Sequence, residues 1–264
     1  MRRAILGTWA YFEYSVLLLV FLPIFAIVRL IHRKDPLLRV PGRWMRSFGR
    51  LTGSLNPLWK ITVAGTPPPD IHHRAYVVVS NHESTADIFV LTKYRWDMRW
   101  IAKEELFKTP FVGWALRLCG DIRVRRGAKE SVVEMMEECR KTLRLGMPLM
   151  LFPEGTRSKD GRLLPFKDGA FQLAVEAQCP ILPIALAGTR DCMPKKSLWF
   201  GDARAHAELL EPISTEGLTA ADIPRIKDLC RARIQEGAEG IRRDLGLFVA
   251  PAPMALPVEA SELR

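Results

Sequence analysis

Short apolar runs alternate with amphipathic stretches from residue 58 to residue 244 of this 264-residue chain. Continuous apolar runs bounded by turn residues are typical of strands that are buried on both faces of a sheet. They predict strands at 58–63, 76–80, 98–102, 122–124, 148–152, 181–187 and 203–210. Apolar positions at helical spacing predict helices at 85–94, 111–119, 128–145, 169–177 and 220–244. This alternation predicts an α/β domain with a largely parallel mixed sheet flanked by helices.

A longer apolar segment precedes the predicted domain. Residues 14–28 carry no charge, and as a helix they would measure about 22 Å at ~1.5 Å per residue, less than a ~30 Å hydrocarbon core. Residues 9–13 and 29–31 would lengthen the helix if their polar ends reach the headgroups, and Pro23 favours a kink. The pattern fits an uncleaved anchor that either spans the bilayer or embeds from one side. No small-x-small cleavage site follows, which disfavours a secretory signal.

Residues 42–57 form a second amphipathic element, with basic residues between its apolar positions. The apolar positions are Trp44, Phe48, Leu51, Leu55 and Leu58. A helix docked on the bilayer interface and a helix packed on the domain fit this pattern equally well. We divide the chain into a helical membrane-anchoring segment (1–57), the α/β domain (58–249) and a loose tail (250–264) that is rich in proline.

The net charge of +10 predicts an anionic partner. No zinc-finger spacing, RNA-binding aromatic signature or long Lys/Arg block favours nucleic acid. Seven basic residues follow the apolar segment: Arg29, Arg33, Lys34, Arg39, Arg43, Arg46 and Arg50. They favour an anionic membrane surface and place the domain on the cytoplasmic side, with the bacterial inner membrane as the expected location.

The cysteines predict reduced thiols in the core. They are odd in number, scattered and without a C-x-x-C pair: Cys119, Cys139, Cys179, Cys192 and Cys230. This distribution favours neither a disulfide framework nor a zinc site.

Two polar strings follow predicted strands. Asn-His-Glu-Ser-Thr-Ala-Asp occupies 81–87, and Phe-Pro-Glu-Gly-Thr-Arg-Ser occupies 152–158. Reactive groups collect beyond the carboxyl ends of parallel strands, so we expect both strings at one sheet edge. On a regular helix, His82 and Asp87 would point about 140° apart. They can therefore pair only if His82 lies in the loop and Asp87 in the first turns of the helix.

Four blocks resemble those of the lysophosphatidic acid acyltransferase (1-acylglycerol-3-phosphate acyltransferase) family. They are N-H-x-x-x-x-D at 81–87, G-x-I-x-V-x-R at 120–126, F-P-E-G-T-R-S at 152–158 and a proline-punctuated apolar strand at 180–184. The family commonly has an acidic residue where this chain has Arg125. The resemblance implies a glycerol-3-phosphate acyltransferase-like fold, with residues 58–249 as the catalytic domain.

The resemblance also implies an activity. A fatty acyl group would pass from acyl-CoA or acyl carrier protein to the sn-2 hydroxyl of lysophosphatidic acid and form phosphatidic acid, without a metal or an organic cofactor. His82 would act as the general base and Asp87 would fix its tautomer. The implied substrate-binding residues are Glu154, Gly155, Thr156, Arg157 and Arg126. The planar forks of the two arginines suit the acceptor's phosphate.

Each motif also has a structural interpretation. Asp87 can cap a helix that begins near His82, and Glu154 can form an ion pair with Arg157. Three alternative functions remain open: transfer to another lyso-lipid such as a lyso-ornithine lipid, a thioesterase that activates water with His82 and Asp87, and a catalytically silent membrane adaptor. Thiol release that needs no acceptor would identify the thioesterase.

Overall fold

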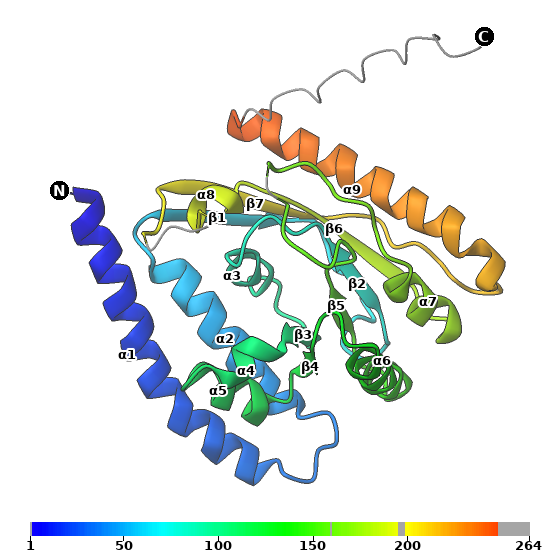
Figure 1. The fold of residues 1–264 in the computed structure, drawn as a ribbon, viewed down its shortest axis with the longest axis horizontal. Coiled ribbons are helices and arrows are strands. Elements are labelled where there is room, and N and C mark those ends of the chain that lie inside the picture. Colours follow the sequence, from blue (N-terminus) through cyan, green and yellow to red (C-terminus); the bar gives the residue numbers. More distant parts are fainter. Residues whose placement is uncertain (1, 159, 195–198, 248–264) are drawn as a thin grey trace, which may run out of the picture.

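The computed structural model describes residues 2–158, 160–194 and 199–247. Within them, seven strands form one sheet with helices on both faces (Figure 1). In spatial order the strands are β1 (Trp59–Ala64), β7 (Ala203–Leu209), β6 (Ile181–Ala187), β2 (Val77–Ser80), β5 (Leu149–Leu151), β3 (Arg99–Lys103) and β4 (Ile122–Val124). Neighbouring strands are parallel except for β6 and β7. The predicted largely parallel mixed sheet is confirmed.

The helices are α1 (Arg2–Ile31), α2 (Arg39–Leu55), α3 (Asp87–Leu91), α4 (Glu104–Lys108), α5 (Val112–Cys119), α6 (Lys129–Arg144), α7 (Gly169–Glu176), α8 (Thr189–Cys192) and α9 (Ile223–Leu245), with a 3₁₀ turn at Ala220–Asp222. The long elements lie where the apolar pattern predicts them. The pattern did not predict α4 and α8, which are too short to show a helical period, and α3 is shorter than the predicted 85–94. The predicted tail at 250–264 lies outside the described residues.

Side chains of the central strands alternate between two cores. Val78 packs in a cluster that includes Leu91 of α3, on one face of the sheet. Val77 and Val79 pack on the other face, in a cluster to which α6, α7 and α9 contribute. Successive strand side chains point to opposite faces, so a strand that is covered on both faces needs apolar residues at every position. This explains the uninterrupted valines before the first polar string.

Helix α1 packs lengthwise against the rest of the molecule. Near its start, the rings of Tyr11 and Phe200 are 4.7 Å apart. Near its end, the fully buried Phe25 lies edge-on to Phe48 of α2 at 6.2 Å. The helix is continuous through Pro23. Its outer side exposes apolar residues: Ile5, Trp9, Phe12, Val16, Leu19, Val20, Ile27 and Leu30. Residues Ile5–Ile31 are long and apolar enough to cross a membrane.

Helix α2 packs on the domain, and three of its arginines contact one buried carboxylate. Arg43 and Arg46 approach the buried Asp97 carboxylate at 2.8 and 3.3 Å, and Arg39 lies 3.9 Å from it. Burial alone would raise the pKa of Asp97, but the hydrogen bond from Arg43 and the charge of Arg46 outweigh burial and lower it. Three of the seven basic residues that we expected to face anionic lipid therefore share an internal carboxylate.

Candidate active site

The polar loops of the site follow parallel strands of one sheet. Strands β2, β5, β4 and β6 run in the same direction, so the loops after them emerge at the same edge. The loops after β2 and β5 contain the two polar strings. The turn after β4 carries Arg126, and the turn after β6 begins at Gly188. The sheet topology therefore brings together segments that are far apart in sequence, as parallel α/β sheets do at their carboxyl edge.

His82 lies in the loop after β2, and Asp87 is the first residue of α3. Nδ1 of His82 is 2.6 Å from Oδ2 of Asp87, which is the loop-and-first-turn arrangement that pairing requires. Asp87 is fully buried. Its carboxylate also accepts the backbone N–H groups of Glu83 and Ser84 and the hydroxyl of Thr189. These donors hold the carboxylate so that Nδ1–H of His82 can donate to it, and no described residue hydrogen-bonds Nε2.

The orientation of the His82 ring is fixed by stacking. Its centroid lies 4.0 Å from that of Phe152, with an interplanar angle of 16°. Phe152 opens the second polar string, immediately after β5. The two motifs therefore contact each other through stacked rings, and the orientation of the imidazole depends on Phe152 as well as on Asp87.

Glu154 connects the two motif loops through the backbone. Its Oε1 accepts the N–H of His82 at 2.7 Å, and its Oε2 accepts the N–H of Leu164 at 2.9 Å. Burial raises the pKa of Glu154, and these two donors oppose the rise. The N–H of Ser158 also donates to the carbonyl of His82. Among the described residues Glu154 makes no ion pair with Arg157, so the structural ion pair considered from the sequence is not formed.

The other predicted binding residues surround this connection. Arg157 Nη1 donates to the hydroxyl of Thr85 at 3.0 Å. Gly155 adopts φ 69°, a left-handed conformation that favours glycine, and Thr156 is exposed. Arg126 is exposed on the turn after β4, where partial burial and the like charge of Arg157 lower its pKa against the opposing charge of Glu105. The two arginines therefore lie within electrostatic range of each other.

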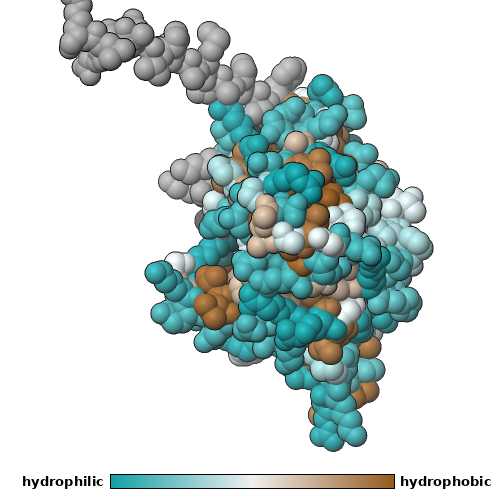
Figure 2. Space-filling model, turned by 90° about the vertical axis from the view of Figure 1, so that its right-hand side faces the viewer, coloured by the Kyte–Doolittle hydropathy of each residue, from teal (hydrophilic) through white to brown (hydrophobic). Residues whose placement is uncertain are grey.

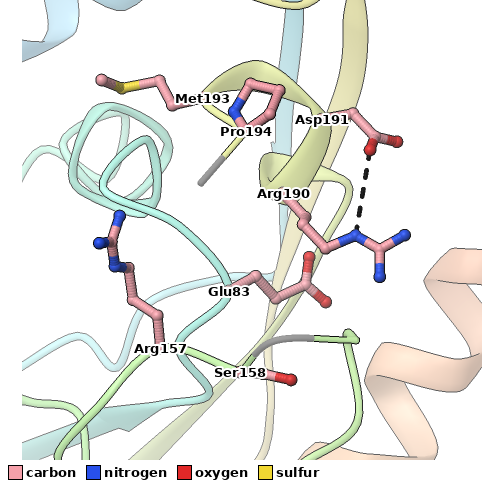
Figure 3. A pocket seen from close by; sticks show the side chains of 7 residues that line it. All are labelled: Glu83, Arg157, Ser158, Arg190, Asp191, Met193 and Pro194. Atoms are coloured by element: carbon pink, nitrogen blue, oxygen red, sulfur yellow. Dashed lines mark ion pairs between the residues drawn. The ribbon is translucent and has the colours of Figure 1, made fainter. Parts of the chain in front are cut away.

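A cavity of about 260 Å³ opens beside these loops. Its lining residues are Glu83, Arg157, Ser158, Arg190, Asp191, Met193 and Pro194. Figure 3 shows Arg157 and Arg190 on opposite sides, with the Glu83 carboxylate between them. Arg190 pairs with Asp191 at 4.0 Å, so Arg157 is the guanidinium in this lining with no carboxylate partner among the described residues. A guanidinium beside a partly apolar hollow suits a phosphate ester with a hydrocarbon substituent.

Sequence reasoning missed Thr189, Arg190 and Arg242. Thr189 and Arg190 lie just beyond the carboxyl end of β6, as His82 lies just beyond the carboxyl end of β2. This shared position after a buried strand was the sequence signal that could have identified them. Gly188 before them has φ 91°, and a Cβ atom there would collide with the carbonyl oxygen of Arg204. Arg242 lies inside α9 and had no distinguishing sequence signal. Within the described part of the chain, no group of three or more His, Cys, Asp or Glu side chains is placed to hold a metal ion.

Comparison with known proteins identifies residues 61–187 as matching an acyltransferase family model. The chain is 40% identical over 167 residues to the 1-acyl-sn-glycerol-3-phosphate acyltransferase alpha of Mus musculus, covering 61% of this chain and 59% of that protein. It is 38% identical over 154 residues to the chloroplastic 1-acyl-sn-glycerol-3-phosphate acyltransferase BAT2 of Brassica napus, covering 57% and 45%. This chain thus matches about half of the length of these curated relatives.

The fold also matches a solved structure. The crystal structure of the 1-acyl-sn-glycerophosphate (LPA) acyltransferase PlsC from Thermotoga maritima superposes with a TM-score of 0.76 at 25% identity. The match covers 91% of this chain and 96% of that one. It therefore extends over the N-terminal helices as well as the sheet. The chain therefore contains an acyltransferase-family domain at residues 61–187, and it is similar to 1-acyl-sn-glycerol-3-phosphate acyltransferases.

Proposed function

We propose that this protein transfers a fatty acyl group from acyl-CoA or acyl carrier protein to the sn-2 hydroxyl of lysophosphatidic acid, and so forms phosphatidic acid. The observation that carries the proposal is the buried Asp87 that holds His82 at 2.6 Å, beside a loop that presents Arg157. The printed names of the relatives support the acceptor.

In the proposed reaction, Nε2 of His82 takes the proton of the acceptor hydroxyl as its oxygen attacks the thioester carbonyl carbon. Asp87 keeps the imidazole in the tautomer that leaves Nε2 unprotonated and stabilises the imidazolium that forms. Collapse of the tetrahedral intermediate breaks the C–S bond, and the proton passes from His82 to the departing thiolate. Neither polar string has the G-x-S-x-G pattern of a serine nucleophile, which favours direct transfer over an acyl-enzyme.

The acceptor's phosphate would bind at Arg157, which lines the cavity, with Arg126 as the second guanidinium on the other side of the phosphate. Burial and, to a smaller extent, the like charge of Arg157 lower the pKa of Arg126. A dianion placed between the two arginines would offset that repulsion and form charge-assisted hydrogen bonds. Thr156 and the backbone at Gly155 would contribute further contacts. The left-handed conformation at Gly155 favours glycine, and glycine has no side chain to block the phosphate from the backbone. Glu154 would act by holding the His82 loop.

We also propose that the outer side of α1 lies in the membrane interface on the cytoplasmic side. The helix packs on the domain near both ends, through Tyr11 and Phe25. A helix that crossed the bilayer perpendicularly would draw the polar domain into the hydrocarbon with it. The opposite side of the molecule, where α6, α7 and α9 lie, is mostly hydrophilic (Figure 2). This asymmetry supports a helix embedded from one side.

Purified protein in detergent, offered labelled acyl-CoA or acyl carrier protein and a panel of lyso-lipids, tests the proposed activity. The expected result is label in phosphatidic acid when lysophosphatidic acid is present. Label in an acylated lyso-ornithine lipid alone would correct the acceptor. Free fatty acid and thiol produced without an acceptor would identify a thioesterase.

A further inference from the structure

A buried ion pair joins the last helix to the His82 loop. Nη2 of Arg242, on α9, lies 2.6 Å from Oε1 of Glu83, and the two side chains are 10% and 4% exposed. Arg242 also donates to the carbonyl oxygen of Gly161. The second carboxylate oxygen of Glu83 accepts the N–H of Gly188 at 3.1 Å. The ion pair of Arg242 with Glu83 therefore connects α9 to three chain segments: the His82 loop, the loop at Gly161 and the turn at Gly188.

The same three segments form walls of the cavity beside the catalytic loop. Glu83 comes from the segment after β2, Ser158 from the segment that continues to Gly161, and Arg190 from the segment that begins at Gly188. In Figure 3 the Glu83 carboxylate lies between the other two walls. A displacement of Glu83 would therefore alter the cavity and the backbone next to His82.

The buried carboxyl group of Glu83 needs the positive charge of Arg242 to stay ionised. Burial raises the pKa of Glu83 to about 7, and the charge and hydrogen bond of Arg242 are the largest opposing effects. Without the guanidinium, the carboxylate would be buried without a counter-charge and would change its protonation or its position.

We propose that Arg242 is a positioning residue for acyl transfer. Acting through Glu83 and Gly161, it sets the separation of the cavity walls and the place of the His82 loop, and so controls how the acceptor is held. This inference rests on the proposed function. The competing interpretation is an ion pair that stabilises the fold without affecting substrate binding.

Steady-state kinetics of Arg242→Met, Arg242→Lys and Glu83→Gln test the proposal, with KM measured separately for acceptor and donor. Arg243→Met is the matched control, because Arg243 is the exposed neighbour on the same helix. We expect Arg242→Met to lose about 10²-fold in kcat/KM for the acceptor, the loss that a ~1 Å misplacement produces. The acceptor KM should rise, while the donor KM and the control stay near wild type. Arg242→Lys should be intermediate, since lysine keeps the charge but not the fork.

A purely structural pair would lower the active fraction and leave both KM values unchanged, which would overturn the proposal. If Arg242→Met does not fold, the lysine and Glu83→Gln variants decide: an unchanged acceptor KM in both would overturn it. If the wild-type protein acylates no lyso-lipid, the proposed function fails. Calorimetric binding of glycerol 3-phosphate to wild type and Arg242→Met then decides the inference, and equal affinities would overturn it.

Discussion

At the scale of single residues, the proposed chemistry depends on the contact between His82 and the buried Asp87. We expect His82→Ala to abolish acyl transfer and Asp87→Asn to reduce kcat about 10⁴-fold, because an amide no longer selects the tautomer that leaves Nε2 free. Turnover of labelled acyl-CoA and near-ultraviolet circular dichroism measure activity and fold separately. Near-normal turnover by folded His82→Ala would contradict the proposed mechanism.

Arg157 supports a second prediction at this scale. We expect Arg157→Lys to raise the acceptor KM about tenfold and to leave the donor KM nearly unchanged, because lysine lacks the planar fork that binds phosphate. The variant also loses the hydrogen bond to Thr85. Thr85→Val is therefore the control for that contact. Equal changes in both KM values would assign Arg157 a structural role.

The sequence indicated the local pairing of His82 with Asp87 and named Glu154, but it did not predict the contacts that join distant segments. The His82–Asp87 geometry followed from a strand, a loop and a helix start within a few residues. Glu154 meets the backbone of His82 across 72 positions, Thr189 meets Asp87 across 102, and Arg242 meets Glu83 across 159. Such contacts depend on strand order, which apolar periodicity does not specify.

At the scale of elements, helix α2 shows how one pattern can have two meanings. Its basic residues suited a membrane surface equally well, and only the fold reveals that Asp97 pairs with three of them. Asp97 lies outside the amphipathic segment, just before β3, so no window over the helix includes it. The local pattern predicted the helix correctly and left its partner open.

Asp97→Asn should destabilise the protein by about 3 kcal/mol or more, since it leaves the buried Arg46 without its carboxylate. The folded state lowers the pKa of Asp97, so its contribution is present above the ordinary value of about 4 and is lost as pH falls through the folded value. The stability gap between wild type and variant should therefore narrow in acid. Urea unfolding at two pH values measures it, with exposed Asp244→Asn as the control. A pH-independent gap would contradict this account.

At the scale of the whole molecule, α1 belongs to the folded core as well as to the proposed membrane surface. Leu18, Phe21 and Phe25 of α1 share a cluster with Phe48 of α2 and Ala115 of α5. The boundary that we drew at residue 57 thus separates elements that pack together. Apolar composition alone indicated an anchor but could not reveal that one side of the helix is buried in protein.

The two sides of α1 should respond differently to substitution. Combined Phe12→Ser, Leu19→Ser and Val20→Ser changes on the exposed side should weaken sedimentation with anionic liposomes and leave the thermal midpoint close to wild type. Phe25→Ala on the buried side should cost about 3–5 kcal/mol of folding free energy. If the triple variant sediments as the wild type does, another surface makes the main membrane contact.

The five buried cysteines make local opening of this molecule chemically visible. Cys119 belongs to the cluster shared with α1, Cys192 to the core on the α3 face, and Cys139, Cys179 and Cys230 to the core on the α9 face. Burial raises the pKa of each thiol, so alkylation requires exposure first. Pulsed alkylation read by peptide mass spectrometry would therefore time the opening of each core. Modification of Cys119 ahead of the others would identify departure of α1 from the domain as the first step of unfolding.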